Sequence, residues 1–497
     1  MKVTFIYPGF ESIGVGYLSA VLKEGGHETH LSLDPLIFAD TIVYNGFLSR
    51  VFDWHEYVIK DVIESKPDIL AMSVATDTYK WAVKYARELK KLIDVKTVFG
   101  GIHVSTMPEQ VILNDAVDYV VLGEGEYPLL DLVNSLENKD GNRSIPNVWF
   151  KEDSKIIKND VRPLISDLDT LPTPDKELFF RTSPNLGRYL YWTSSSRGCM
   201  FRCSFCSNNV LKDMYKKKGR YQRRRTVENM VSELEEAKKK YPFTRVFFSD
   251  ETFNYDNKWL EEFAEEYPKR VGKPYFCQVH PNLVNETTAK LMRKSMCYSA
   301  ELGVETLDDD LRREVLNRRE TVEDIKNAVN LLESNDIRCS VEHLLGIPGQ
   351  TIDDVIHIAN FYNENRPSRV QCFWLTYYPR LEITKKAIEM GIIKPFDYTK
   401  ENDSVPTTPF LLGGMSFDKE INKLFTLFSF YLYLPKKLNK IIIDKKLYRY
   451  LPSFKSLPPI VTKTFSRAHA IHILQIFRKY TYFMRRKLMI FIGLEKM

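Results

Sequence analysis

Two long stretches of this chain alternate short apolar runs with helical patterns, and short glycine-bearing turns join them. Alternation of this kind predicts an α/β fold with parallel sheets. In the first stretch the expected strands are Val3–Tyr7, Ile69–Ser73, Thr97–Gly100 and Tyr119–Leu122, and the expected helices are Gly16–Lys23 and Tyr79–Leu92. We therefore predict an N-terminal, doubly wound, Rossmann-like parallel sheet whose ligands bind beyond the carboxyl ends of its strands.

The second stretch begins near Tyr189 and ends near Tyr378. Its expected strands are Tyr189–Ser194, Arg245–Ser249, Tyr275–Val279, Ser299–Gly303, Arg338–Leu345 and Val370–Leu375. Its expected helices are Val227–Lys240, Trp259–Tyr267, Glu286–Arg293 and Val322–Ser334. This repetition predicts a full or partial (β/α) TIM-type barrel with its functional residues at the C-terminal ends of the strands.

We expect the chain to consist of four parts, because its 497 residues exceed the usual length of one domain and its composition changes along the chain. Residues 1–137 form the first predicted domain and residues 189–394 the barrel. Residues 138–188, which are rich in Asp, Pro, Asn and Lys, are expected to be a linker. Residues 395–497 are predicted to be a basic, mainly helical C-terminal region.

Three of the seven cysteines, Cys199, Cys203 and Cys206, fall within eight residues, and the other four are scattered. In a large chain this pattern favours a metal site over a disulfide framework. Three thiolates can hold three irons of a [4Fe-4S] cube and leave one iron open, whereas the usual cluster has four cysteine ligands. Zinc is the alternative, but it usually requires a second Cys or His pair, which this loop lacks.

The spacing C-x-x-x-C-x-x-C, with the aromatic Phe205 before the last cysteine, resembles the signature of the radical S-adenosylmethionine (SAM) superfamily. The resemblance implies that SAM chelates the open iron through its amino and carboxylate groups. It also implies that an electron from the cluster cleaves the sulfonium to a 5′-deoxyadenosyl radical.

Three later segments are similar to SAM-binding positions of the same family. Ser249–Phe253 ends the second barrel strand, where an acidic residue would meet the SAM ammonium through a charge-assisted hydrogen bond. Gly303–Thr306 resembles the fourth-strand motif, and Gly346–Thr351 resembles the turn along the adenine. The implied SAM contacts are Phe205, Glu251 (with Asp250 as the alternative), Glu305, Gly346 and Pro348.

The N-terminal sheet resembles the cobalamin-binding domains of related radical enzymes. Ser73 and the Gly100-Gly101 turn have the spacing that cradles a nucleotide tail, because glycine lets the backbone approach and serine donates a hydrogen bond. Phe99–Glu109 and Leu122–Glu126 are also similar to segments of these enzymes. The implied cobalamin contacts are Ser73, Gly100, Gly101, His103, Gly123 and Glu124.

One departure concerns the cobalt. The Asp-x-His-x-x-Gly motif, whose histidine ligates cobalt in classical cobalamin mutases, is absent from the sequence. His27 and His30 are expected to belong to a helix-to-strand turn instead. The lower axial ligand of the cobalt therefore stays open.

These features together predict a radical SAM methyltransferase that acts on an unactivated carbon of a small or lipid-like substrate through methylcobalamin and a 5′-deoxyadenosyl radical. The first alternative is oxidation or ring closure without methyl transfer, as in anaerobic magnesium-protoporphyrin ester cyclase. A redox-sensing protein that binds nucleic acid or a membrane is the second. A methylthiotransferase is disfavoured, because no cysteine precedes Cys199. The expected reductant is a protein such as flavodoxin or ferredoxin.

The C-terminal region carries fourteen Lys or Arg and one acid, Asp444, between Lys436 and Lys487. Peripheral membrane contact through residues 420–497, nucleic-acid binding and a solvated helical cap all stay open, with nucleic acid the least favoured. The apolar run Leu424–Leu434 is too short to span a bilayer, and the N-terminus lacks signal-peptide features. We expect a cytoplasmic protein, with membrane contact at most peripheral.

Overall fold

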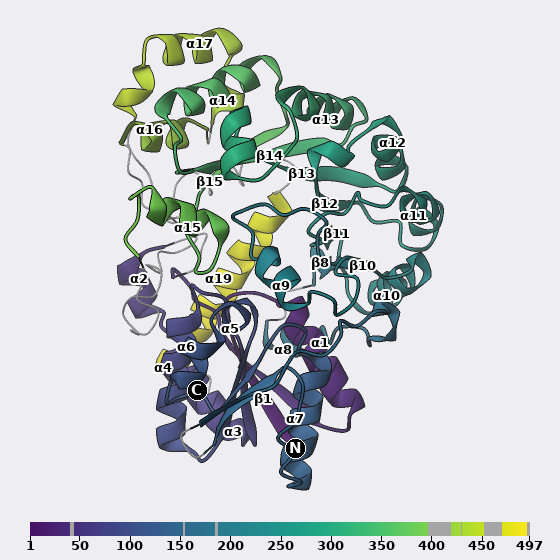
Figure 1. Cartoon of the computed structure of the whole chain (residues 1–497), viewed down its shortest axis with the longest axis vertical. Coiled ribbons are helices and arrows are strands. Elements are labelled where there is room, and N and C mark those ends of the chain that lie inside the picture. The colour runs from purple at the N-terminus through teal and green to yellow at the C-terminus, as the bar shows by residue number, and fades with distance from the viewer. Residues whose placement is uncertain are drawn as a thin grey trace.

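A computed structural model describes residues 1–39, 44–152, 155–183, 187–395, 419–428, 430–451 and 470–494. It contains two large sheets with helices around them and a separate two-stranded pair, and the chain passes from the first large sheet to the second near residue 189 (Figure 1). The predicted α/β class and the order of the two sheets are therefore confirmed.

The first sheet has the strand order β2-β1-β3-β4-β5-β6-β7. Its first five strands pair in parallel, as predicted, and β6 and β7 are antiparallel. The strands are β1 (Lys2–Pro8), β2 (Glu28–Asp34), β3 (Ile69–Ser73), β4 (Lys96–Gly100), β5 (Tyr119–Val121), β6 (Val148–Glu152) and β7 (Lys155–Lys158). The helices after them include α1 (Ile13–Glu24), α3 (His55–Ser65), α4 (Tyr79–Leu92), α5 (Ile102–Thr106), α6 (Pro108–Leu113) and α7 (Glu126–Asn138).

The strands β6 and β7 lie inside the stretch that composition assigns to a linker. Val148, Trp149 and Phe150 pair with β5, and Asn147 is fully buried beside them. The polar residues around this hairpin hide its short apolar alternation in the sequence. The first half of the predicted linker therefore extends the N-terminal sheet.

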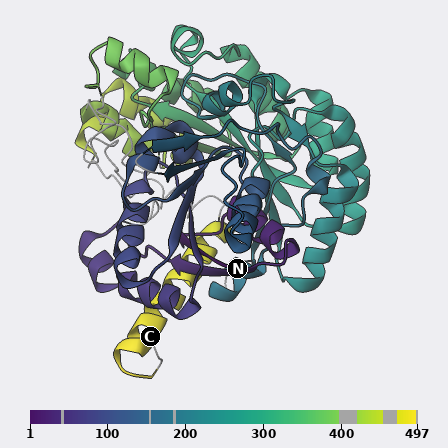
Figure 2. The same ribbon diagram turned by 60° about the horizontal axis from the view of Figure 1, so that its bottom comes forward.

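The second sheet has six parallel strands in the order β15-β14-β13-β12-β11-β8, which makes it a partial barrel. The helices between the strands form an arc along its outer face (Figure 2). The strands are β8 (Leu190–Thr193), β11 (Arg245–Phe248), β12 (Tyr275–Val279), β13 (Cys297–Glu305), β14 (Arg338–Leu345) and β15 (Arg369–Trp374). The helices are α10 (Val227–Lys240), α11 (Asn257–Arg270), α12 (Glu286–Lys294), α13 (Val322–Ser334) and α14 (Ile352–Glu364).

Local sequence explains where these helices begin. Thr321 and Asp324 form a reciprocal capping box at the start of α13, and Thr351 and Asp354 do the same for α14. Such boxes satisfy backbone N–H groups that the first helical turn leaves without partners. Each strand end is thereby separated from the next helix by a short, fixed turn, which positions the residues at the carboxyl edge.

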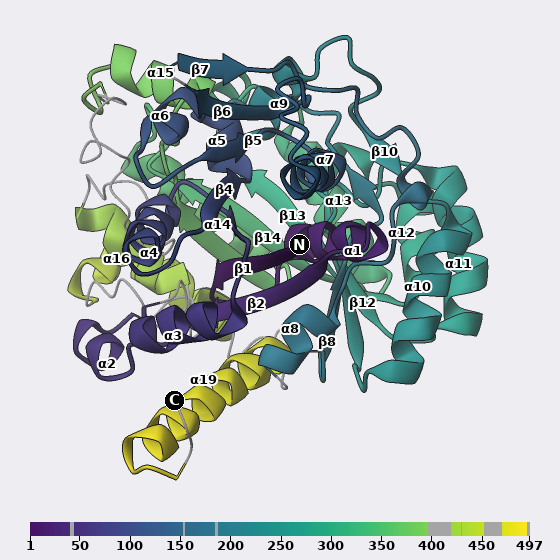
Figure 3. The ribbon, with the colours of Figure 1, turned by 90° about the horizontal axis from the view of Figure 1, so that it is seen from below.

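The C-terminal region is helical where it is described, but it does not form a separate unit. Helices α16 (Lys419–Phe428) and α17 (Lys436–Asp444) pack against α14. The last helix, α19 (Ala470–Phe491), returns to the N-terminal sheet, where Tyr480 and Phe483 join its core and Phe483 packs on Trp54 (Figure 3). No helix in the described part of the chain is long and apolar enough to cross a membrane.

Candidate functional site

A cavity of about 370 Å³ lies between the carboxyl edges of the two sheets. Ligands of α/β sheets bind beyond these edges, so this is the expected place for a site. The N-terminal sheet contributes, among others, Tyr17, Ser73, Gly100, Gly101, Gly123 and Glu124, and the barrel contributes Ser196, Arg197, Gly198, Asn208, Tyr221 and Glu251.

The three-cysteine loop leaves this cavity at Gly198. Its start is held by β9 (Ser196–Arg197), which pairs with β10 (Arg223–Arg224). Gly198 has a φ of +81°, and a Cβ there would lie 2.5 Å from the Tyr221 carbonyl oxygen, so the turn requires glycine. Farther along, the Cys206 N–H donates to the Cys203 carbonyl oxygen (3.0 Å). The loop thus curls back and brings all three predicted cysteines to one end of the barrel.

The thiols lie in a setting that suits a metal cluster. Burial raises the pKa of the Cys203 thiol to about 11 and also raises the pKa of Cys206. A bound metal reverses this effect of burial on the thiol pKa, because coordination deprotonates a thiol outright. Within the described ranges, no three His, Cys, Asp or Glu side chains converge as the ligands of a single ion would. A cube that carries each thiolate on its own iron has no need of such convergence.

The remaining four cysteines do not belong to this loop. All seven cysteines are free, and Cys277, Cys297, Cys339 and Cys372 are buried in successive strands of the barrel. They are packed among apolar side chains of the main core. We assign them to packing, as is usual for buried free cysteines.

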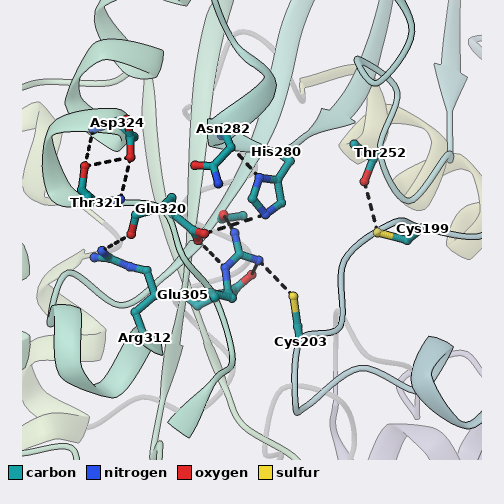
Figure 4. A network of polar contacts seen from close by, with 12 residues as sticks. Cys199, Cys203, Thr252, His280, Asn282, Glu305, Arg312, Glu320, Thr321 and Asp324 are labelled. Atoms are coloured by element: carbon teal, nitrogen blue, oxygen red, sulfur yellow. Dashed lines mark hydrogen bonds and ion pairs between the residues drawn. The ribbon is translucent and has the colours of Figure 1, made fainter. Parts of the chain in front are cut away.

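Arg318 is a functional candidate that the sequence analysis missed. Its Nη1 donates to the Cys203 sulfur (3.6 Å) and lies 3.6 Å from Glu305, its Nη2 donates to the Gly303 carbonyl oxygen (2.6 Å), and its Nε donates to Glu320. Figure 4 shows Glu305, Glu320 and His280 gathered next to Cys203. The only feature of the sequence that could have indicated Arg318 is its position shortly after the Gly303–Thr306 motif.

The structure separates the two acidic candidates at the end of β11. Asp250 is fully buried and accepts hydrogen bonds from the Ser195 N–H (3.0 Å), the Ser195 hydroxyl (2.7 Å) and the Ser196 hydroxyl. Glu251 lines the cavity instead, and its surroundings raise its carboxyl pKa by burial. Glu251 is therefore the carboxylate that is available to a ligand, and Asp250 anchors the start of the cysteine loop.

Glu305 lies at a strained point of the barrel. Its φ is +67°, where a non-glycine residue is uncommon, and the pairing of β13 with β14 is irregular between Gly303 and Glu305. Burial raises its pKa to about 7, although the charge of Arg318 opposes this. The carboxyl group is therefore poised between its two protonation states near neutral pH.

The remaining predicted SAM contacts do not line the cavity. The Gly346 N–H donates to the Gln350 side chain (2.8 Å), and its carbonyl accepts from the Tyr377 hydroxyl (2.8 Å). Phe205 packs on the apolar cluster that contains Ile347 of the same turn. The structure therefore brings Phe205 close to the turn of Gly346 and Pro348, but places none of the three on the cavity wall.

The predicted cobalamin contacts converge at the carboxyl ends of β3, β4 and β5. Ser73, Gly100, Gly101, Gly123 and Glu124 all line the cavity. Gly101 has a φ of +95°, and a Cβ there would lie 2.8 Å from backbone atoms of Val74. No other residue fits this turn without a backbone shift. A Cβ at Gly123 would collide with the Tyr215 ring, so this glycine accommodates a side chain of the protein itself.

His103 differs from the other five, because it is buried away from the cavity. Its Nδ1 contacts the Thr76 hydroxyl (3.1 Å), and its ring packs on Tyr79. Burial lowers its pKa to about 4, so the ring is neutral at pH 7. His27 and His30 lie at the opposite end of the sheet and contact Asn134 and Asp61. His27 is in the turn that the sequence predicts, whereas His30 belongs to strand β2.

Glu124 joins the two sheets through buried ion pairs. Arg197 donates to its carboxylate (3.2 Å), and Arg223 donates to both of its oxygens (2.8 and 3.1 Å). Arg197 also donates to Glu126 (2.6 Å). Burial opposes ionisation of Glu124, but the hydrogen bonds from Arg223 and the charge of Arg197 outweigh it and hold the pKa below its ordinary value.

These two arginines were not predicted from the sequence. Arg197 stands two residues before Cys199, so it ties the cysteine loop to the N-terminal sheet. We name Glu124, Glu126, Arg197 and Arg223 the interdomain ion cluster. Its effect is to fix the cysteine loop across the cavity from the glycine turns.

Comparison with known proteins agrees with this division. Residues 6–133 match the B12 binding domain, and residues 193–362 match the radical SAM superfamily. The two matched ranges coincide with the N-terminal sheet and the partial barrel.

Two relatives cover most of the chain. An anaerobic magnesium-protoporphyrin IX monomethyl ester cyclase of Rubrivivax gelatinosus is 28% identical over 82% of this chain and 73% of its own length. An uncharacterised methyltransferase of Pyrococcus horikoshii is 24% identical over 89% of this chain and 95% of its own. The solved structure of OxsB, a cobalamin-dependent SAM radical enzyme with aqua-cobalamin and SAM bound, superposes with a TM-score of 0.65 at 17% identity, over 97% of this chain and 75% of that chain.

The interdomain ion cluster gives a first prediction. Replacement of Glu124 by Gln leaves the Arg223 guanidinium without a counter-charge and leaves Arg197 paired with Glu126 alone, and we expect it to lower the free energy of unfolding by about 3 kcal/mol. Glu109→Gln is the matched control, because Glu109 pairs with Arg380 and Lys158 on the surface, where such pairs contribute about 0–1 kcal/mol. Urea unfolding at pH 7 compares the two variants.

The same cluster predicts a pH dependence. Since the folded pKa of Glu124 is depressed, its contribution is present above the ordinary carboxyl pKa and is lost as pH falls through the lower folded value. The difference between wild type and Glu124→Gln should therefore shrink in acid. Equal stability of the Glu124 and Glu109 variants at pH 7 would contradict this role of the cluster.

Proposed function

We propose that this chain, which belongs to the radical SAM enzymes with a B12-binding domain, methylates an unactivated carbon of its substrate. The two domains imply a [4Fe-4S] cluster, SAM and cobalamin as cofactors. The observation that carries the proposal is the shared cavity, which has the glycine turns of one domain on one wall and the start of the cysteine loop on the other.

When bound, the cluster and SAM supply a carbon radical and cobalamin supplies a transferable methyl group. Cys199, Cys203 and Cys206 would hold the cluster. The Thr252 hydroxyl lies 3.4 Å from the Cys199 sulfur and Arg318 donates to the Cys203 sulfur, so two of the thiolates have hydrogen-bonding neighbours. Hydrogen bonds to cluster sulfurs are one of the ways in which a protein sets a cluster potential.

Glu251 and Glu305 would receive the charged parts of SAM. Glu251 has its carboxylate on the cavity wall, so it can accept a hydrogen bond from an ammonium. Glu305 lies next to Cys203 (Figure 4), and the Arg318 guanidinium, 3.6 Å from Glu305, adds a positive charge there. The turn of Gly346 and Pro348, with Phe205 packed nearby, would border the nucleoside.

Ser73, Gly100, Gly101, Gly123 and Glu124 would border cobalamin, with the backbone of the glycines close to the ligand. No histidine lines the cavity in the described part of the chain. The interdomain ion cluster would hold these residues and the start of the cysteine loop on opposite sides of the cavity.

Oxidation or cyclisation is the second candidate, because the cyclase of Rubrivivax gelatinosus is the more identical of the two relatives. The methyltransferase of Pyrococcus horikoshii is aligned over nearly its whole length, and that similarity favours methyl transfer.

Product mass distinguishes the two reactions. Reconstituted enzyme is supplied with SAM that carries a trideuterated methyl group and with extracts fractionated by size and polarity. We expect a product that gains the mass of the labelled methyl group in place of one hydrogen, and S-adenosylhomocysteine next to 5′-deoxyadenosine. A product that only loses hydrogen, with no label in it, would contradict methyl transfer and favour the cyclase-type reaction.

We also propose that a peripheral membrane contact supplies a lipid-like substrate. In and around α17, the side chains of Tyr433, Leu438, Ile441, Leu447 and Tyr450 are exposed, and Tyr450 reaches 85%. The neighbouring Lys437, Lys440, Lys445 and Lys446 are exposed as well. Apolar and aromatic side chains mixed with lysines are typical of segments that lie in an anionic membrane interface. We name these nine residues the α17 surface.

Deletion of residues 420–497 would remove α19 from the core of the N-terminal sheet, so point variants are the appropriate test. Full-length protein should co-sediment with vesicles that contain phosphatidylglycerol, and the double variant Ile441→Glu, Tyr450→Glu should lose most of that binding. Phe47→Glu, which alters another exposed aromatic, is the control. Equal sedimentation of all three proteins would contradict this contact.

A further inference from the structure

The outer side of the cysteine loop carries a basic surface that the reaction at the cavity does not use. Between residues 202 and 220 the chain has six Lys or Arg and one acid, Asp213. Helix α9 (Asn208–Met214) lies against the loop, and the turn after it packs on Val161 and Leu164. The side chains concerned are Arg202, Lys212, Lys216, Lys217 and Arg220.

Specific contacts fix this segment on the loop. Lys212 donates to the Phe201 carbonyl oxygen, Asn209 donates to the Cys203 carbonyl oxygen (2.7 Å), and Arg202 pairs with Asp213 (3.2 Å). Every one of these contacts involves a residue of the loop itself. These contacts hold Arg202 and Lys212 on the cysteine loop.

The charge on this surface is largely uncompensated. Lys216, Lys217 and Arg220 are exposed, and they have no ion-pair or hydrogen-bond partner through their side chains among the described residues. Lys218, by contrast, pairs with Asp160. Three cations without counter-charges on one short segment attract an acidic partner by long-range electrostatics.

The cysteine loop itself carries an exposed apolar side chain. Met200, which follows Cys199 directly, is 48% exposed. A flexible, polarizable methionine on a binding surface adapts to different partners. Because Met200 is adjacent to Cys199 in the chain, this exposed side chain lies close to one of the thiols that would hold the cluster.

A hollow adjoins the same loop. A groove of about 680 Å³ is lined by Arg202 and Ser204 of the loop, by α9 and by α15 (Glu382–Glu389). The acids on its far wall, Glu382 and Glu389, already have lysine partners at 3.2 and 3.8 Å. They therefore do not cancel the basic charge around Met200.

We infer that Met200, Arg202, Lys212, Lys216, Lys217 and Arg220 form the docking surface for a small acidic electron-carrier protein that reduces the cluster. Radical SAM enzymes need a reductant, and this inference rests on the proposed function of the same loop. The step is a single electron transfer: the carrier's reduced flavin or iron–sulfur centre loses one electron and the oxidised cluster gains it, with no bond made or broken. Electron-transfer complexes are weak and have small interfaces, so charged residues around one apolar contact are sufficient to form such an interface.

The test uses full-length protein with a reconstituted cluster, and reduced flavodoxin as the probe. Cluster reduction is followed by its loss of visible absorbance in a stopped-flow instrument, for wild type and for the double variant Lys216→Glu, Lys217→Glu. The matched control is Lys437→Glu, Lys440→Glu, which makes the same charge change on α17, far from α9 in Figure 1. Dithionite serves as a small reductant that needs no docking surface.

We expect flavodoxin to reduce the Lys216, Lys217 variant about ten-fold more slowly than wild type at low ionic strength, with the gap closing in high salt. The α17 control should keep the wild-type rate, and dithionite should reduce all three proteins equally. A Met200→Glu variant should show the same selective loss. Wild-type rates with flavodoxin in both surface variants, or an equal loss in the α17 control, would overturn the docking surface.

The two proposals fail separately in this experiment. A chain that takes up no cluster on reconstitution contradicts the proposed function. A chain whose cluster forms and cleaves SAM with dithionite, yet responds to flavodoxin regardless of Lys216 and Lys217, contradicts the docking surface alone.

Discussion

The interdomain ion cluster is the interaction on which the rest of the site depends. Glu124 follows β5 of the N-terminal sheet, and Arg197 and Arg223 lie in the two-stranded pair of β9 and β10 that follows the first barrel strand, so their ion pairs connect the two sides of the cavity. Side chains with so little access to water remain ionised at low cost only when they are paired. Loss of any member of the interdomain ion cluster should therefore destabilise the protein. Because Arg197 precedes Cys199 by two residues, the same pairs orient the cysteine loop toward the N-terminal sheet.

The features that depend on local sequence could be predicted. Alternating apolar runs placed most strands within one or two residues, and the spacing of Cys199, Cys203 and Cys206 indicated the cluster loop. The glycine turn at Gly101 was also predictable, because its positive φ admits no other residue without strain. The similarity to the B12 binding domain and to the radical SAM superfamily confirms the two-domain interpretation.

Features that depend on partners far away in the chain could not be predicted. Asp250 and Glu251 are neighbours, and only the hydrogen bonds from Ser195 and Ser196 show which of them faces inward. Glu124 was assigned to cobalamin on a motif, whereas its carboxylate is held by arginines 73 and 99 residues later. Helix α19 has an evident apolar face at Tyr480 and Phe483, but nothing in its own sequence says that this face covers the N-terminal sheet.

The measurement that tests the central claim most directly asks whether both cofactors are held by the one chain. Full-length protein is reconstituted anaerobically with iron, sulfide and hydroxocobalamin, desalted, and examined by ultraviolet–visible spectroscopy before reduction in the presence of SAM. The account predicts stoichiometric corrinoid bands on top of the cluster absorbance, followed by 5′-deoxyadenosine. A cluster that yields 5′-deoxyadenosine from a protein without retained corrinoid would contradict the assignment of the shared cavity.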